Sequence, residues 1–176
     1  SGLESWFQDN IPFALEEYGL DTSYFDNPIL GIGFHAMYDE RYDRVILTKR
    51  DLKPTKDFIT QYDLGSIIYN NVTHRFIYNG VELKFDNFTF FKKSGWTVSY
   101  DIELNVWASF HDYIPYKYTR SADELASFNE GSTDVWVHND ELNRGKFYDT
   151  DYASEFEFIY NVAKDTDKTF YSFEYM

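Results

Sequence analysis

A serine, a histidine and an aspartate lie within four residues at Ser109-Phe110-His111-Asp112. These residue types can carry out nucleophilic hydrolysis, in which a histidine takes the proton of a serine hydroxyl and an aspartate orients the histidine. Neighbouring residues of a strand point to opposite faces, so Ser109 and His111 can align while Asp112 cannot. The spacing therefore argues against a catalytic triad within one strand, and we assign His111 no catalytic role.

Carboxylates are abundant, with 30 Asp and Glu residues against 16 Lys and Arg residues and a net charge of −14. Two carboxylates that flank a groove can hydrolyse a glycosidic bond as acid and base, but no pair stands out among so many. Asp39 and Asp43 could contribute to a Ca²⁺ site, yet the dense Asp-x-Asp-x-Asp spacing that supplies enough oxygen ligands is missing. Turn capping explains both residues better.

The histidines are scattered, without the His-x-x-x-His or His-x-His spacing of a metal site: His35, His74, His111 and His138. The chain has no cysteine, which excludes disulfides and thiolate metal sites. Gly31-Ile32-Gly33 lacks the third glycine and the helix of a dinucleotide-binding motif, and indicates a bulge or a close backbone approach instead. We therefore expect no catalytic residue, no cofactor and no metal.

Charge and hydropathy argue against two further classes of partner. Lys and Arg form no cluster, so tight nucleic-acid binding through phosphate neutralisation is not expected. No apolar run reaches the ~18–20 residues that span a bilayer, so membrane insertion is not expected either. The first residues, Ser1-Gly2-Leu3-Glu4, show no signal-peptide pattern, and we interpret the chain as part of something larger.

One hairpin pattern occurs twice: Tyr-Asp, three variable residues, then Asp or Asn, between two apolar runs. One copy contains Tyr38, Asp39 and Asp43, and the other contains Tyr100, Asp101 and Asn105, followed in the next strand by Trp107 and His111. The first Asp can cap the turn with its side chain, and the later Asp or Asn tolerates the left-handed conformation that returns the chain. A degenerate third copy runs from Val137 to Asn143. We assign all these residues to structural hairpin turns.

The elements that position these turns are strands. Aromatic residues make up 21% of the chain, and aromatic side chains fit pleated, half-buried surfaces. We predict an all-β, or β-dominated, fold of repeated antiparallel hairpins, propeller-blade-like or β-sandwich-like, with little helix. Three hairpins are predicted, which pair residues 31–38 with 44–49, 75–78 with 81–85 around Asn79-Gly80, and 96–100 with 106–111. Two further strands are predicted at 66–69 and 88–91. All these strands are expected to pair locally.

Other parts of the chain are less regular. Residues 3–18 predict one or two helical turns, and the residues after Asp51 predict a short loop through Pro54. Ser121 to Glu124 fits a helix capping box, but we favour a hairpin from Leu125–Phe128 to Val135–His138.

The final residues alternate polar and apolar side chains. This alternation predicts half-buried strands at Glu155–Tyr160 and Thr169–Tyr175. The length is that of one ordinary domain, so we predict a single β-rich domain over residues 1–176, with 1–115 and 116–176 as a possible subdivision.

Seven segments, spread over most of the chain, carry a family resemblance: Phe25 to Pro28, Gly31 to Asp39, Arg44 to Asp51, Trp96 to Asp101, Trp107 to Pro115, Phe156 to Asn161 and Lys168 to Tyr175. Together they resemble the tail muzzle, or nozzle, protein of crAss-like gut bacteriophages. The most distinctive piece is the string SYD…W-x-SFHDYIP within residues 99–115, whereas residues 52–93 and 116–150 match weakly.

The resemblance implies a virion structural protein at the distal end of a short phage tail. Such proteins combine propeller-like domains into an oligomeric ring, which forms a channel for DNA and ejected proteins and catalyses nothing. It implies a homo-oligomer that contacts other phage tail proteins, with the acidic charge flanking a channel past which DNA slides. The repeated turns would then serve as scaffold.

Two other functions stay open from the residues. Aromatic richness and acidity are also typical of carbohydrate-binding β-modules, for which a host-surface glycan would be the partner. Their stacking platform would need exposed, coplanar tryptophans, and the candidates are Trp96, Trp107 and Trp136. A glycosidase-type enzyme is the other alternative.

Overall fold

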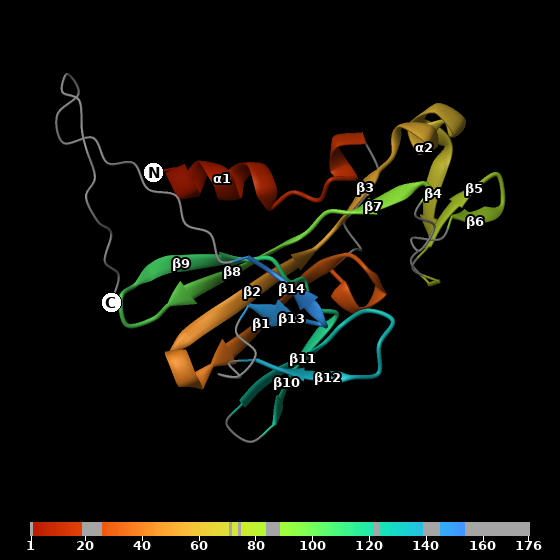
Figure 1. Cartoon of the computed structure of the whole chain (residues 1–176). Helices are drawn as coiled ribbons and strands as arrows, with labels where there is room; N and C mark the ends of the chain where they lie inside the picture. Colours follow the sequence, from red (N-terminus) through yellow and green to blue (C-terminus); the bar gives the residue numbers. More distant parts are fainter. Residues whose placement is uncertain are drawn as a thin grey trace, which may run out of the picture.

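The structure is a computed structural model of the chain, and it describes residues 2–18, 26–70, 72–73, 75–83, 89–121, 124–138 and 145–153. The molecule is β-dominated, with several antiparallel sheets and few helices, as predicted (Figure 1). Its four-stranded sheet packs against the three-stranded sheet formed by residues 117–121, 124–128 and 135–137, which corresponds to the sandwich-like form of the prediction.

A four-stranded antiparallel sheet forms the centre of the molecule, in the order β1 (Gly33–Asp39), β2 (Arg44–Arg50), β8 (Trp96–Asp101) and β9 (Val106–His111). Both predicted hairpins are confirmed, because β1 pairs with β2 and β8 pairs with β9. β2 also pairs with β8, with Arg44 opposite Asp101. The two hairpins therefore lie side by side although a long stretch of chain separates them.

The two central strands continue beyond the sheet as a ribbon of β3 (Leu52–Pro54) and β7 (Phe91–Lys93). Where the ribbon joins the sheet, Ser94 N–H donates to the carbonyl of Asp51 at 2.8 Å. The predicted loop through Pro54 and the local pairing of the predicted strand 88–91 are therefore wrong. Of the described residues of that segment, 89 and 90 form a turn and Phe91 alone belongs to β7. Pro54 ends the ladder, a position that tolerates the missing N–H of proline, so the proline did not exclude a strand.

A smaller unit lies at the far end of this ribbon (Figure 1). It contains α2 (Lys56–Gln61), the 3₁₀ turn η4 (Leu64–Ser66) and a sheet of β4 (Ile67–Asn70), β5 (Arg75–Tyr78) and β6 (Val81–Leu83). The predicted Asn79-Gly80 turn joins β5 to β6, with φ values of 49° and 78°. The apolar core lies here and beside the ribbon: Leu15, Ile32, Leu52, Phe58, Phe76, Leu83 and Phe91.

Helix α2 is absent from the sequence prediction. It begins after Thr55, whose hydroxyl accepts a hydrogen bond from Phe58 N–H at 3.3 Å, and Phe58 is fully buried. A threonine that accepts from the third residue after it is a recognised start signal for a helix. The sequence therefore contains the start signal of α2 at Thr55, but a helix of six residues is too short to show a periodic apolar pattern.

A second sheet of β10 (Lys117–Ser121), β11 (Glu124–Phe128) and β12 (Val135–Val137) covers one face of the central sheet. The hairpin favoured over the capping box is confirmed as β11 with β12. Ser121 and Glu124 are opposite each other in the β10–β11 ladder, so the capping box does not form. A short pair, β13 (Lys146–Phe147) and β14 (Thr150–Asp151), follows.

Helix α1 (Gly2–Asn10) lies on the opposite face of the central sheet (Figure 1). Its aromatic side chains meet those of the sheet: the ring centroids of Trp6 and Phe110 are 4.8 Å apart, and those of Phe7 and Trp107 are 4.7 Å apart. With the 3₁₀ turn η1 (Glu16–Tyr18), α1 confirms the helical turns predicted for residues 3–18.

A buried lysine fastens the segment after α1 to the sheet. The Lys49 ammonium donates to the carbonyls of Asn10 and Pro12 at 2.9 and 2.8 Å, and it lies 2.7 Å from the Asp51 carboxylate. The same Asp51 oxygen accepts from Ala14 N–H at 2.9 Å. Burial raises the pKa of Asp51, and the hydrogen bond from Lys49 opposes that shift.

Gly33 opens β1, after the 3₁₀ turn η2 (Pro28–Leu30), with a φ of 148°. A Cβ at this position would lie 2.6 Å from the backbone nitrogen of Asn27, so the chain passes too close for any side chain. The close backbone approach predicted for Gly31-Ile32-Gly33 is confirmed.

Three predictions concern residues that the structure does not describe: the strands Glu155–Tyr160 and Thr169–Tyr175, and the part of the third hairpin copy beyond His138. None of the described helices has the length and apolar character needed to cross a membrane.

Candidate functional site

The two Tyr-Asp-x-x-x-Asx turns lie together at one end of the central sheet. They are neighbours because Arg44, the first residue of β2, is opposite Asp101, the last residue of β8. A backbone hydrogen bond joins them directly, from Ile102 N–H to the carbonyl of Asp43 at 3.1 Å. The sequence repeat is therefore also a spatial pair.

The last residue of each turn has the predicted left-handed backbone, with φ of 45° at Asp43 and 56° at Asn105. The tyrosine of each copy donates its hydroxyl to this residue: Tyr38 to Asp43 Oδ1 at 2.6 Å, and Tyr100 to Asn105 Oδ1. The hydrogen bond to Asp43 raises the pKa of Tyr38. The sequence indicates this hydrogen bond, because in both copies a tyrosine lies five residues before the Asp or Asn that ends the turn.

The first aspartate has different roles in the two copies. Asp101 caps its turn as predicted, accepting from Leu104 N–H at 2.8 Å. Asp39 makes no such cap to the 3₁₀ turn η3 (Glu40–Tyr42), so that prediction is wrong. Instead Asp39 is 1% exposed and accepts from Arg44 Nε at 2.9 Å. Its burial depends on the second sheet, which local turn chemistry does not reveal.

Polar and aromatic side chains fill the space between the central sheet and the second sheet, and His35, His111 and His138 lie there. The His35 ring lies 4.8 Å from Tyr118, and Tyr113 lies 5.1 Å from His111 and 4.9 Å from His138. These histidines come from three distant parts of the chain, so sequence spacing could not bring them together. Among the described residues, no three His, Asp or Glu side chains form a group that could hold a metal ion.

Burial controls the protonation of this layer. It lowers the pKa of His35, His111 and His138 to about 4 in each case, and nearby Arg44 also lowers that of His111. It raises the pKa of Tyr148 to about 12. These histidines and this tyrosine are therefore neutral at pH 7, because a charge in this position would lose its hydration.

One pair in this layer has the elements of a nucleophile and a base. Ser127 Oγ lies 2.6 Å from His138 Nε2 and 2.6 Å from the Tyr148 hydroxyl. Ser127 is completely buried and His138 is 4% exposed, so a substrate cannot reach the serine in this arrangement. The contacts satisfy buried polar groups. Ser109, the serine of the sequence motif, is exposed on β9, and the Nε2 atom of His111 has no hydrogen-bond partner among the residues that the structure describes.

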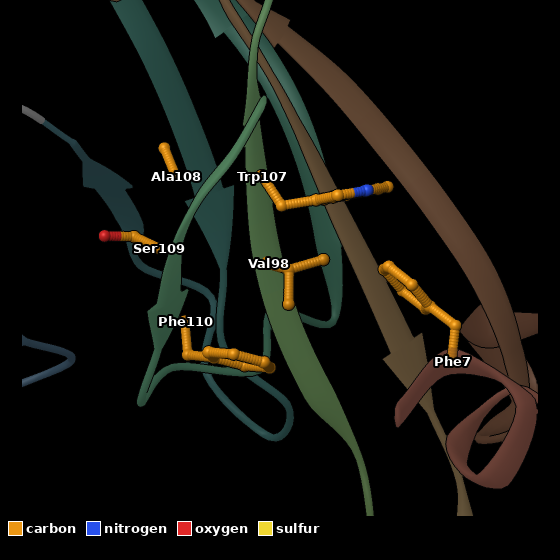
Figure 2. A pocket seen from close by; sticks show the side chains of 6 residues that line it. All are labelled: Phe7, Val98, Trp107, Ala108, Ser109 and Phe110. Carbon is orange, nitrogen blue, oxygen red and sulfur yellow. The ribbon is translucent and has the colours of Figure 1, made fainter. Parts of the chain in front are cut away.

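Strand β9 is the most exposed part of the central sheet. All its residues except His111 are exposed, including Trp107 at 39% and Phe110 at 57%. A shallow hollow of about 60 Å³ lies between this strand and α1, with Trp107, Val98 and Phe110 pointing towards Phe7 (Figure 2). That volume is far below the ~300–1,000 Å³ of ligand pockets.

The three candidate tryptophans do not form one platform. Trp96 is half-buried beneath α1, where its ring lies 5.2 Å from Trp6 at an angle of 64°. Trp136 belongs to β12 of the second sheet and contacts Tyr148. Of the three, Trp107 alone counts among the exposed large apolar side chains.

Comparison with models of known protein families, with curated proteins and with solved structures finds no match to this chain.

Proposed function

We propose that the chain is a non-enzymatic structural part of a phage virion, within an oligomeric tail muzzle that forms a channel for DNA and ejected proteins. The observation that supports this most is where the resembling segments lie. Segments 31–39, 44–51, 96–101 and 107–115 are separated in sequence, and they supply all four strands of the central sheet. The resemblance therefore coincides with one structural unit.

The way this sheet uses its reactive side chains also supports a scaffold. The tyrosines and the Asp or Asn residues of the two turns bond to each other, and Asp39 pairs with Arg44. The histidines of the inter-sheet layer, of which His138 is buried and His35 and His111 are half-buried, are neutral at pH 7. These groups stabilise turns and sheet packing, which is what a virion component requires.

The acidic composition fits the same role. A net charge of −14 repels the DNA phosphates, so DNA could move along such a surface without sticking to it. Other subunits and other tail proteins are the partners that this function requires.

The gene neighbourhood tests the proposal. We expect the gene to lie beside the portal and tail genes of a phage. We also expect mass spectrometry of the purified phage particles to detect the protein. A gene that lies among bacterial metabolic genes, or particles that lack the protein, would contradict the proposal.

A carbohydrate-binding module is the second candidate, and the exposure of Trp107 and Phe110 on one face of β9 favours it. Aromatic faces of this kind can stack on sugar rings. A glycan array decides the question: a carbohydrate module must bind a glycan and lose that binding in Trp107→Ala. Val81→Ala, which removes a 65% exposed side chain from β6, is the control. An array without a hit removes this candidate.

A further inference from the structure

The histidines between the central sheet and the second sheet come from both sides of that layer. The register of the central sheet places four polar residues in one row across its strands: His35, Thr48, Thr97 and His111. Cross-strand neighbours share a face, and the Thr48 hydroxyl lies 2.6 Å from the Tyr118 hydroxyl of β10, so this row faces the second sheet. His138 belongs to the other side, because its N–H donates to the carbonyl of Leu125 in β11 at 2.8 Å.

Positive charges already lie beside the three imidazole rings. The Arg50 guanidinium is near His35, and the Arg44 guanidinium is near both His111 and His138. The Nε2 atoms of His35 and His111 have no hydrogen-bond partner among the described residues. A protonated ring would therefore face a like charge in a place where burial removes most of its hydration.

Few groups in this layer can offset a protonated histidine. The Asp39 carboxylate is near His111 and His138, but it already accepts a hydrogen bond from Arg44 Nε at 2.9 Å. Asp112 is a second carboxylate near His111. The neighbouring tyrosines stay uncharged, because burial raises the pKa of each: Tyr113, Tyr118 and Tyr148.

The contacts that hold the two sheets together are separate from the main apolar core. The apolar cluster between the sheets is small and contains Ile46, Tyr118 and Leu125, with Met37 packed against it. Two ion pairs also join the sheets: Arg50 with Glu130, and Arg120 with Glu40. The main core lies in the smaller unit and beside the ribbon, and its described residues include no histidine.

We propose that the second sheet separates from the central sheet as the pH falls, while the smaller unit stays folded. Separation exposes all three rings to water together, so one opening event takes up three protons. Protons then act as a ligand that binds only the open state, and they shift the equilibrium towards it. The inference is independent of the proposed function, since it concerns two sheets within one copy.

The sign and size of the effect follow from linkage. Each histidine has a pKa of about 4 in the closed layer, and 6.5 is its ordinary value in water. The closed state is therefore unaffected well above pH 6.5 and is weakened as the pH falls from 6.5 towards 4. Between pH 7 and pH 5 one such histidine raises the opening constant about 20-fold, and three together raise it roughly 10⁴-fold.

Hydrogen–deuterium exchange of the full chain tests the proposal, with rates corrected for intrinsic exchange at each pH. Peptides from β10 to β12 report on the second sheet, and peptides from α2 and β5 report on the smaller unit. We expect the protection of β10–β12 to fall roughly 10⁴-fold between pH 7 and pH 5. We also expect it to be at least tenfold below that of the smaller unit at both pH values.

Two results of this experiment overturn the inference. Equal protection of the two regions would mean that the second sheet opens only when the whole chain unfolds. A fall of less than about 20-fold in β10–β12 would mean that its opening does not expose the three histidines.

A substitution on β9 tests whether the histidines cause the effect. His111→Gln keeps a polar side chain that takes up no proton, so the fall in β10–β12 protection should become about 20-fold smaller. Ser109→Gln, at an exposed position of the same strand, is the control and should leave the fall unchanged. His35→Gln repeats the test on β1 if His111→Gln does not fold. Histidine variants that keep the full fall would contradict the proposal.

Discussion

Protonation of His138 should destabilise the protein as the pH falls from 7 to 5. The folded pKa is about 4, lowered from 6.5 mainly by burial, so below pH 6.5 the unfolded chain binds a proton that the folded chain does not. Stability is therefore unaffected well above pH 6.5, falls as the pH drops through 6.5 towards 4, and levels off below 4. Each pKa unit corresponds to 1.36 kcal/mol, which gives a loss of about 2 kcal/mol between pH 7 and pH 5. The pKa values of His35 and His111 are also lowered to about 4, so these two histidines add losses of the same sign.

Urea unfolding at pH 7 and pH 5 measures this effect. The matched variant is His138→Gln, which keeps a polar group that can bond Ser127 but cannot take up a proton in this range. We expect the free energy of unfolding of the variant to fall by about 2 kcal/mol less than that of the wild type between the two pH values. Most carboxylates titrate below pH 5, so they contribute little to the difference. An equal fall in both proteins would refute the assignment of His138 as a buried neutral group.

Three further substitutions test the packing by urea unfolding. Lys49→Met removes one partner of the buried pair with Asp51 and should lower the free energy of unfolding by about 3–5 kcal/mol; a loss below 1 kcal/mol would mean that the pair is hydrated. Gly33→Ala should cost more than about 2 kcal/mol, because a Cβ meets backbone at 2.6 Å, whereas the control Gly65→Ala should cost less than about 1 kcal/mol; equal costs would contradict the close approach. Asn105→Gly keeps the left-handed turn but loses the bond from the tyrosine, so it should cost about 0.5–1.5 kcal/mol, and no loss would show that the bond contributes nothing.

Local chemistry was the part of the fold that the sequence predicted well. The left-handed Asp43 and Asn105, the Asn79-Gly80 turn and the cap at Asp101 each depend on residues within five positions. The same reasoning missed Asp39, since the residue looks like a cap in sequence and is buried only because the second sheet covers it.

Contacts between distant residues were the part that the sequence could not predict. The β2–β8 and β3–β7 ladders join segments that lie far apart in the chain, and no local pattern specifies such pairs. The inter-sheet layer has the same origin, because His35 and His138 meet Tyr118 and Tyr113 only through sheet packing. The sequence could not predict that Trp107 is exposed either, because apolar residues in a strand are usually buried.

Native mass spectrometry of the protein, from low to high concentration, tests the proposed assembly most directly. A tail muzzle predicts oligomers of more than two copies, with one dominant stoichiometry that corresponds to a closed ring. A protein that remains monomeric, or that stops at a dimer at the highest concentration, would contradict a ring-forming role for this chain.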